Sequence, residues 1–131
     1  MENFVKEFLL SAPSKALATN GPQGLNVVPV SSIFVEENNI ILINYFMQKT
    51  LENILETKTV SLAVWKELYG YQIKADCDYK EEGEIFDKYV LKVKEILPKR
   101  IVKGVLILTI NDIFDIAINK NTKEYLLGGV N

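Results

Sequence analysis

The chain has 131 residues, a mass of 14.9 kDa and a formal net charge of −2 at pH 7, and this length predicts a single domain over residues 1–131. Its 48% of hydrophobic residues is typical of a globular domain. The chain has no histidine, which excludes Ser-His-Asp triads, Cys-His pairs, histidine-ligated haem and the usual zinc sites within it. Acidic residues outnumber basic ones, so we do not expect a nucleic-acid partner. We expect no metal site either, because the chain lacks histidine.

The first predicted element is a short helix within residues 1–12. Its apolar positions have helical spacing: Phe4, Val5, Phe8 and Leu9. Pro13 follows and ends the helix. Because Lys6 and Glu7 interrupt the apolar positions, the segment has neither a signal-peptide core nor a membrane span, and we expect a cytoplasmic protein with no membrane partner.

Apolar strands follow this helix. Segments 15–20 and 25–35 predict two strands around a Gly- and Pro-containing turn at 21–24. Residues 40–46 are a continuous apolar run, which predicts a third strand that is buried on both faces or belongs to a closed barrel. Pro29 lacks an N–H group, so we expect it where its strand is unpaired or bulged.

The rest of the chain alternates between helix and strand patterns. The expected elements are, in chain order, a short helix at 50–56 with Thr50 as its N-cap, a strand at 59–65, an alternating strand at 71–80, a helix at 84–97, strands at 103–110 and 112–118, and a tail at 119–131. Pro98 ends the longer helix. We expect the tail to be ordered only when something binds it.

These elements predict a mainly β fold of the α+β type. There are six or seven strands, and short connections between most of them imply antiparallel pairing. A short helix follows the third strand and a longer helix lies near the C-terminus. The pattern therefore favours a closed β-barrel with helical additions over a doubly wound sheet.

The segment at 44–50, where a buried strand ends and a helix begins, is the main candidate site. Its residues are Asn44, Tyr45, Phe46, Met47, Gln48, Lys49 and Thr50. Free N–H groups and the positive end of the helix dipole attract anions, so a Lys and a hydroxyl at this position predict a phosphate site. The alternative interpretation is that Thr50 only caps the helix and Lys49 is a solvated surface residue.

Several short motifs occur in a characteristic order: Ala18-Thr19, Gly24, Gln48-Lys49, Ile54-Leu55, and a strand from Val60-Ser61-Leu62 to Trp65. This order, from about residue 10 to 116, resembles the FMN-binding split-barrel family that includes the pyridoxamine 5'-phosphate oxidases. A Lys-Thr-x-x-Asn segment at 49–53 also resembles the small single-domain FMN-binding proteins of sulfate-reducing bacteria.

The resemblance implies a split barrel that forms a homodimer and binds FMN at the subunit interface. Lys49 and Thr50 would hold the phosphate, and Gln48 occupies a Ser or His position of the relatives. Two groups of residues would enclose the ring: Val28, Pro29, Val30, Ser31 and Ser32 on one side, and Asn44, Tyr45, Phe46 and Met47 on the other. Pyridoxamine phosphate oxidases use several arginines for phosphate and substrate, and the chain has one, Arg100, so B6 oxidation is not the expected activity.

Other conspicuous residues have structural interpretations. We expect Trp65 to belong to the core and Cys77 to be a small packing residue. The carboxylates at 81–84 favour the dipole of the helix that follows them. Arg100 and Lys103 lie in a basic stretch that we interpret as a solvated helix end. In the alternative interpretation, either residue reaches a cofactor across a dimer interface.

The leading functional prediction is an FMN-binding redox protein, either an electron carrier or a small flavin reductase. A second hypothesis is a flavin- or deazaflavin-dependent oxidase or reductase of the same family. A third is a non-redox module for a small ligand or haem; without histidine, a haem would need Tyr, Cys or Met as its ligand.

Overall fold

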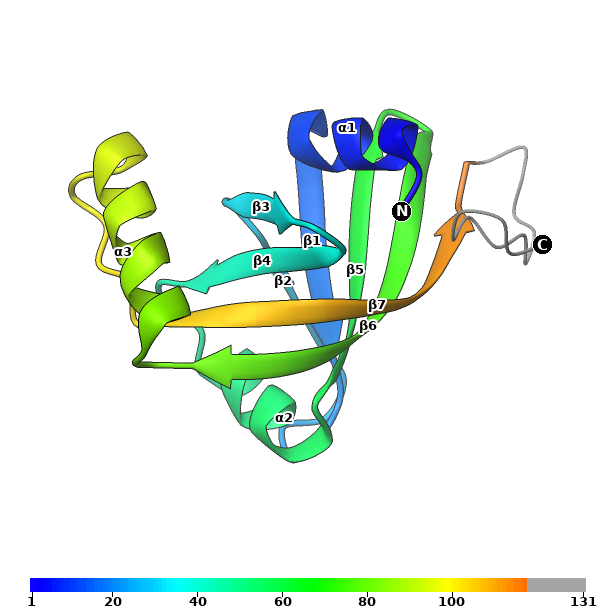
Figure 1. Cartoon of the computed structure of the whole chain (residues 1–131). Coiled ribbons are helices and arrows are strands. Elements are labelled where there is room, and N and C mark those ends of the chain that lie inside the picture. Colours follow the sequence, from blue (N-terminus) through cyan, green and yellow to red (C-terminus); the bar gives the residue numbers. More distant parts are fainter. Residues whose placement is uncertain (118–131) are drawn as a thin grey trace.

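The computed structural model describes residues 1–117, which form one seven-stranded antiparallel sheet and three helices (Figure 1). The helices are α1 (Asn3–Ser11), α2 (Lys49–Thr57) and α3 (Glu84–Ile96). The strands are β1 (Ser14–Thr19), β2 (Asn26–Pro29), β3 (Ile33–Glu36), β4 (Asn39–Asn44), β5 (Thr59–Lys66), β6 (Tyr69–Lys80) and β7 (Gly104–Asp115). None of the helices in these residues is long and apolar enough to cross a membrane. The predicted tail at 119–131 lies outside the described residues.

The mainly β fold with three helices is confirmed, but two predicted strands have other boundaries. The segment at 25–35 forms two strands, β2 and β3, separated by residues 30–32. Pro29 ends β2 at the free edge of the sheet, where its missing N–H group costs no ladder bond. The two strands predicted at 103–110 and 112–118 are one strand, β7, because a bulge opposite Lys74 and Ala75 accommodates Asn111 without a turn.

The sheet is strongly curved and open. Its strand order is β2-β1-β5-β6-β7-β4-β3, and within residues 1–117 the two edge strands do not pair with each other. The prediction of a closed barrel is therefore wrong. The split barrel that the family resemblance implies is confirmed. The long strands β6 and β7 run through both halves of the molecule, as Figure 1 shows, and their bulge increases the bend between the halves.

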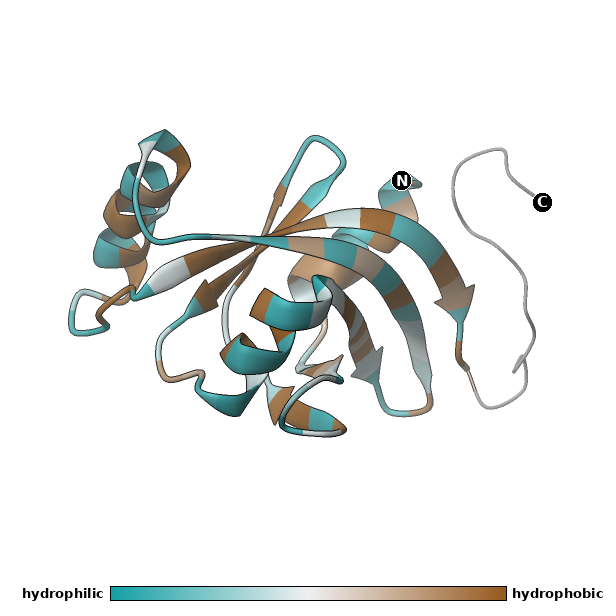
Figure 2. Cartoon of the chain, turned by 90° about the horizontal axis from the view of Figure 1, so that it is seen from below, coloured by the Kyte–Doolittle hydropathy of each residue, from teal (hydrophilic) through white to brown (hydrophobic). Residues whose placement is uncertain are grey.

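The main core lies inside this curve. Strand residues alternate between buried and accessible positions, so that Leu62, Val64 and Ile73 face inward. Figure 2 shows the corresponding alternation of hydrophobic and hydrophilic residues along the strands. Helix α1 covers one end of the barrel with Val5 and Leu9, both fully buried. The predicted N-terminal helix therefore contributes to the core by its apolar face, as its spacing indicates.

A second, smaller core lies between α3 and the other face of β4. Ile41 and Ile43 of β4 pack there with Tyr89 and Val93 of α3, while Ile40 and Leu42 face the main core. The continuous apolar run of β4 is thus explained by burial on both faces, one of the two alternatives that the sequence left open.

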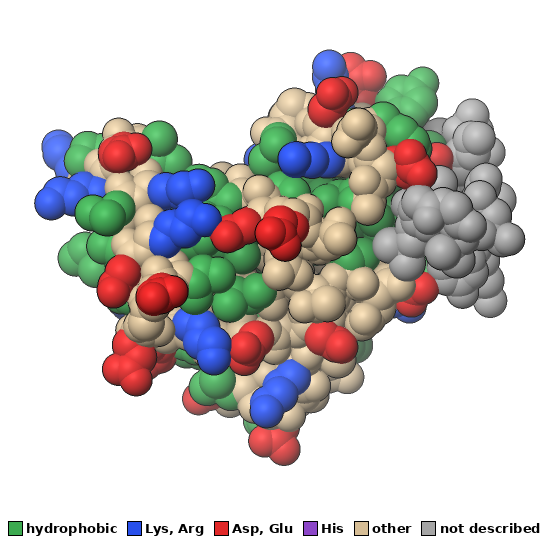
Figure 3. All heavy atoms as spheres, viewed as in Figure 1, with side chains coloured by type: hydrophobic (Ala, Val, Ile, Leu, Met, Phe, Trp, Pro, Cys, Tyr) green, Lys and Arg blue, Asp and Glu red, His purple; other side chains and the backbone are tan. Residues whose placement is uncertain are grey.

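A polar contact fastens α3 to the edge of the sheet. The Tyr89 hydroxyl donates to Glu36 Oε2 at 2.5 Å, and Lys88 Nζ donates to Glu36 Oε1 at 2.9 Å. The hydrogen bond from Tyr89 is the main cause that lowers the pKa of Glu36. Lys and Arg side chains lie beside carboxylates on the α3 side of the molecule in Figure 3, consistent with this pairing at an accessible surface.

Helix α2 lies at the opposite end of the barrel from α1 (Figure 1), and Asn53 fastens it to the β1–β2 hairpin. Asn53 is fully buried; its Oδ1 accepts from the Gln23 N–H at 2.9 Å, and its Nδ2 donates to Thr19 Oγ1 at 3.2 Å and to the Gly24 carbonyl at 2.9 Å. One amide side chain therefore satisfies polar groups of both ends of the hairpin turn.

Replacing Asn53 by Ala removes this connection and takes away the partner of the buried Thr19 hydroxyl and of two backbone groups of the hairpin turn. We expect N53A to lower the free energy of unfolding by roughly 2–3 kcal/mol in urea denaturation. The control E56A changes an exposed residue of the same helix and is expected to stay within about 0.5 kcal/mol of the parent. Equal stability of N53A and E56A would contradict the role given to Asn53.

Candidate functional site

The candidate site begins where β4 ends, and Asn44 shapes the chain there. This side chain is buried; its Oδ1 accepts from the Met47 N–H at 2.7 Å and its Nδ2 donates to the Tyr79 hydroxyl at 2.9 Å. The Asn44 carbonyl also accepts from the Lys103 N–H at 2.9 Å. These bonds hold the turn at 44–48, the connection from β4 to α2, against β6 and the start of β7.

Gly104 permits this arrangement because Tyr79 packs directly against its Cα. A Cβ at position 104 would collide with the ring and hydroxyl of Tyr79, so only glycine fits there. Burial raises the pKa of the Tyr79 hydroxyl, which therefore stays protonated near neutral pH.

A cavity of about 390 Å³ opens beside this turn, within the range of small-molecule sites. Its lining residues are Val28, Pro29, Val30, Ser31, Ile43, Tyr45, Phe46, Met47 and Arg100. The structure thus brings the predicted residues at 28–31 together with those at 45–47. The lining is largely apolar, and it includes Phe46, of which 75% is exposed.

The other predicted site residues lie around the cavity rather than in its lining. Ser32 and Asn44 are buried, and the Ser32 hydroxyl lies 3.0 Å from the hydroxyl of the lining residue Tyr45. Gln48 and Lys49 are exposed at the start of α2. Thr50 is buried, and its Oγ1 accepts from Asn26 Nδ2 at 2.7 Å.

The N-cap of α2 lies two residues earlier than predicted, and this changes the role of Thr50. Gln48 occupies the N-cap position, makes no side-chain cap bond, and Lys49 is the first helical residue. Thr50 lies inside the first turn and is not the cap, so its hydroxyl serves the contact with β2 instead. The first N–H groups of α2 therefore have no side-chain cap and lie next to Met47 in the cavity lining, a position suited to an anion.

Arg100 is a lining residue that sequence reasoning placed elsewhere. Its guanidinium carbon lies 5.1 Å from the ring centroid of Tyr45 and 5.9 Å from that of Phe46. The basic stretch is interpreted from the sequence as a solvated helix end, whereas the structure places Arg100 in the lining of the cavity. Its reach across a dimer interface stays a prediction. No local pattern could have located it, because the loop after α3 meets the 44–48 turn only in the folded chain.

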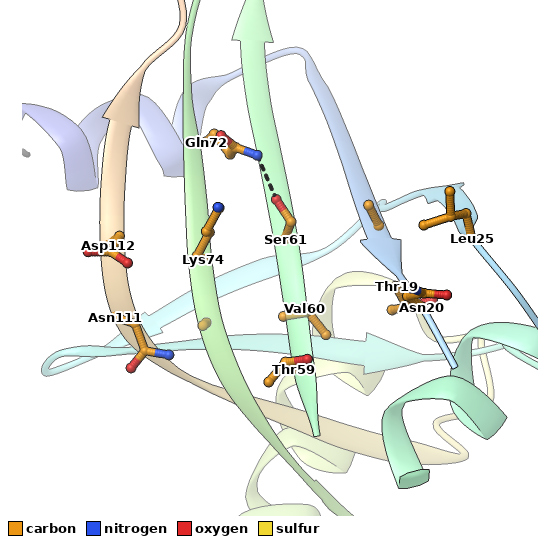
Figure 4. Close-up of a pocket in the computed structure, with 12 residues that line it drawn as sticks. Thr19, Asn20, Leu25, Thr59, Val60, Ser61, Gln72, Lys74, Asn111 and Asp112 are labelled. Carbon is orange, nitrogen blue, oxygen red and sulfur yellow. Dashed lines mark hydrogen bonds between the residues drawn. The ribbon is translucent and has the colours of Figure 1, made fainter. Parts of the chain in front are cut away.

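A second cavity, of about 440 Å³, lies on the outer face of the sheet (Figure 4). Residues of β1, β5, β6 and β7 line it, and Gln72 Nε2 donates there to Ser61 Oγ at 3.1 Å. Among residues 1–117, His, Cys, Asp and Glu side chains form no cluster suited to a metal ion.

Cys77 and Trp65 lie away from the first cavity. Burial raises the pKa of the Cys77 thiol to about 12, in agreement with a packing role. Trp65 is 36% exposed on the outer face, so its expected place in the core is wrong.

Comparison with known proteins identifies relatives of this chain. Residues 1–115 match the family described as pyridoxamine 5'-phosphate oxidase. An uncharacterized protein of Methanocaldococcus jannaschii is 32% identical over 106 residues, which cover 76% of this chain and 70% of that protein.

Solved structures share the fold at low sequence identity. HupZ of Group A Streptococcus has a TM-score of 0.79 at 19% identity, covering 93% of this chain and 98% of that one. An FMN-binding protein from Syntrophomonas wolfei has a TM-score of 0.71 at 19% identity, covering 87% and 82%. The haem storage protein HutZ of Vibrio cholerae has a TM-score of 0.68 at 16% identity, covering 86% and 92%. These likenesses confirm the split-barrel fold.

Substituting Gly104 tests whether the contact between Gly104 and Tyr79 holds the site together. We expect G104A to displace the Tyr79 ring and to lower the free energy of unfolding by roughly 1–3 kcal/mol, measured by urea denaturation. The effects of G104A and N44A should be less than additive, because both act through Tyr79. T109A, at an exposed position of the same strand, is the control. Additive effects of G104A and N44A would contradict the coupling.

Proposed function

The chain belongs to the pyridoxamine 5'-phosphate oxidase family, and we propose that it is a flavoprotein that binds FMN and has a redox role, as an electron carrier or a small flavin reductase. The observation that carries the proposal is the cavity at residues 28–31 and 45–47, which opens beside the uncapped N-terminus of α2. An apolar cavity next to an anion site suits a ligand with a flat apolar ring and a terminal phosphate.

The proposed binding mode assigns each part of FMN to residues of this chain. The ring occupies the cavity, where Val28, Val30 and Met47 offer apolar contacts and Ser31 offers a hydroxyl. The phosphate lies at the first N–H groups of α2 with the Lys49 ammonium, which is exposed and makes no ion pair within residues 1–117. Thr50 contributes its backbone N–H, since its hydroxyl contacts Asn26.

When bound, FMN supplies electron or hydride transfer, and the protein supplies orientation and electrostatics. The apolar lining excludes water from one side of the ligand. The bonds of Asn44 hold the turn at 44–48 in place, so the contacts of Tyr45, Phe46 and Met47 are preorganised before a ligand enters.

The alternatives differ in the ligand of the same cavity. A structure with the same fold is described as an F420 reductase, and a deazaflavin-dependent reductase is the second candidate. A haem-binding module has less support in the residues: the Tyr45 hydroxyl lies against Ser32, and Cys77 is buried in the main core. The visible spectrum of the loaded protein distinguishes flavin, deazaflavin and haem.

A homodimer is also proposed, through the outer face of β1, β2 and β5. Strand register places Ala16 opposite Pro29 and Ala63, and Ala18 opposite Val27 and Ser61, all on this face. Val27 is 67% exposed there, although outward positions of a solvated sheet are usually polar. Small side chains let a second sheet approach closely. The family resemblance implies a homodimer, and the choice of this face rests on its exposed apolar and small residues.

The phosphate assignment is tested by replacing Lys49 with Ala. K49A removes a charge-assisted contact, so the dissociation constant for FMN is expected to rise about ten- to a hundredfold in fluorescence titration. The stability of the ligand-free protein should change by no more than about 0.5 kcal/mol. Riboflavin, which lacks the phosphate, should bind K49A and the parent equally, and K94A on exposed α3 is the matched control. Unchanged FMN affinity in K49A would contradict the assignment of the phosphate site to Lys49.

The dimer is tested by light scattering and by a substitution in the proposed interface. The parent is expected to have about twice the chain mass of 14.9 kDa at micromolar concentration. A63R places a large charged side chain in the centre of this face and should yield the monomer, whereas T109R, at an exposed position of β7, should not. A monomeric parent with flavin bound would refute the assembly.

A further inference from the structure

The loop that carries Arg100 is held on both sides. The Arg100 N–H donates to the Leu97 carbonyl at 3.0 Å, in a turn that continues directly from α3. The Lys103 N–H donates to the Asn44 carbonyl at 2.9 Å, which joins the loop to the turn at 44–48. Because Tyr89 and Glu36 fasten α3 to the sheet, Arg100 is presented to the cavity by anchored backbone.

The guanidinium of Arg100 has aromatic contacts but no acidic partner. It lies over the rings of Tyr45 and Phe46, and within residues 1–117 it makes no ion pair and no side-chain hydrogen bond. These contacts with aromatic rings use no hydrogen-bond acceptor, so the N–H groups of the guanidinium remain available to an anion. The cavity lining formed by these residues includes no Asp or Glu, and Lys103 Nζ lies 5.6 Å from the Phe46 ring centroid.

We propose that Arg100 is a specificity-determining residue that binds the carboxylate of a second ligand, a small molecule with an apolar body, in the cavity that the proposed function assigns to FMN. The inference rests on that function for the identity of the first ligand. A carboxylate pairs with the two-pronged edge of a guanidinium, while the apolar lining accommodates the rest of the molecule. The FMN phosphate has its own site at α2 and Lys49, so Arg100 is available to another anion.

The experiment uses benzoate as the probe and benzamide as its neutral counterpart. Benzoate is titrated into the FMN-loaded protein while the visible flavin spectrum is recorded, and into the ligand-free protein by calorimetry. We expect benzoate, and not benzamide, to perturb the spectrum. R100Q should weaken benzoate binding at least about tenfold, and R100K should weaken it less, because lysine keeps the charge and loses the planar fork.

Controls separate this inference from the proposed function. K99Q removes the neighbouring exposed cation, which does not line the cavity, and should change benzoate binding by less than about twofold. FMN and riboflavin are titrated into R100Q in parallel, and any change in affinity should be the same for both, because Arg100 lines the cavity assigned to the ring and not the phosphate site.

Two results would overturn the role of Arg100: equal binding of benzoate by R100Q and the parent, or a loss of FMN affinity in R100Q that riboflavin does not share. The second result would assign Arg100 to the FMN phosphate. Failure of the parent to bind any flavin refutes the proposed function instead, and calorimetry on the ligand-free protein still measures whether Arg100 binds the carboxylate.

Discussion

Burial of β4 on both faces is the constraint on which the rest of the structure depends. Ile40 and Leu42 belong to the main core and Ile41 and Ile43 to the core beneath α3, so this strand joins two apolar clusters. Its pairing with β3 and β7 leaves little freedom in where it ends. The turn at 44–48 therefore leaves the sheet from a firmly packed position. Because residues 45–47 line the cavity, this packing also fixes the position of the cavity wall.

Two buried amide side chains hold the segments around the cavity in place. Asn44 orders the backbone of the turn that enters α2, and Asn53 ties α2 to the β1–β2 hairpin. Both side chains satisfy buried polar groups on segments distant in sequence. The two walls of the cavity, at 28–31 and 45–47, are consequently held at a set separation.

The distribution of charge around the cavity agrees with an anionic ligand. The chain as a whole has a net charge of −2, yet the cavity has Arg100 in its lining and Lys103 over Phe46. The N-terminus of α2 adds the positive end of a helix dipole on the same side. Local positive charge in a chain that is acidic overall is better suited to small anions than to a polyanion such as nucleic acid.

Local patterns were sufficient for much of the architecture. The spacing of apolar residues predicted α1 and α3, the alternation at 71–80 predicted β6, and the continuous apolar run at 40–46 predicted burial of β4 on both faces or closure. Ordered motifs further indicated the family. These features depend on neighbouring residues, whose side-chain period is set by backbone geometry alone.

Other features depend on contacts between distant segments, and only the tertiary structure decided them. The corner between β2 and β3, the continuity of β7 through its bulge and the open edges of the sheet follow from how its two halves pack. Thr50 resembles an N-cap in the sequence, but its hydroxyl accepts a hydrogen bond from Asn26. Arg100 reaches the cavity because the loop after α3 contacts Asn44. Sequence alone thus determined the elements and the segment where the site begins, whereas the partners of each polar side chain depended on which segments the two cores bring together.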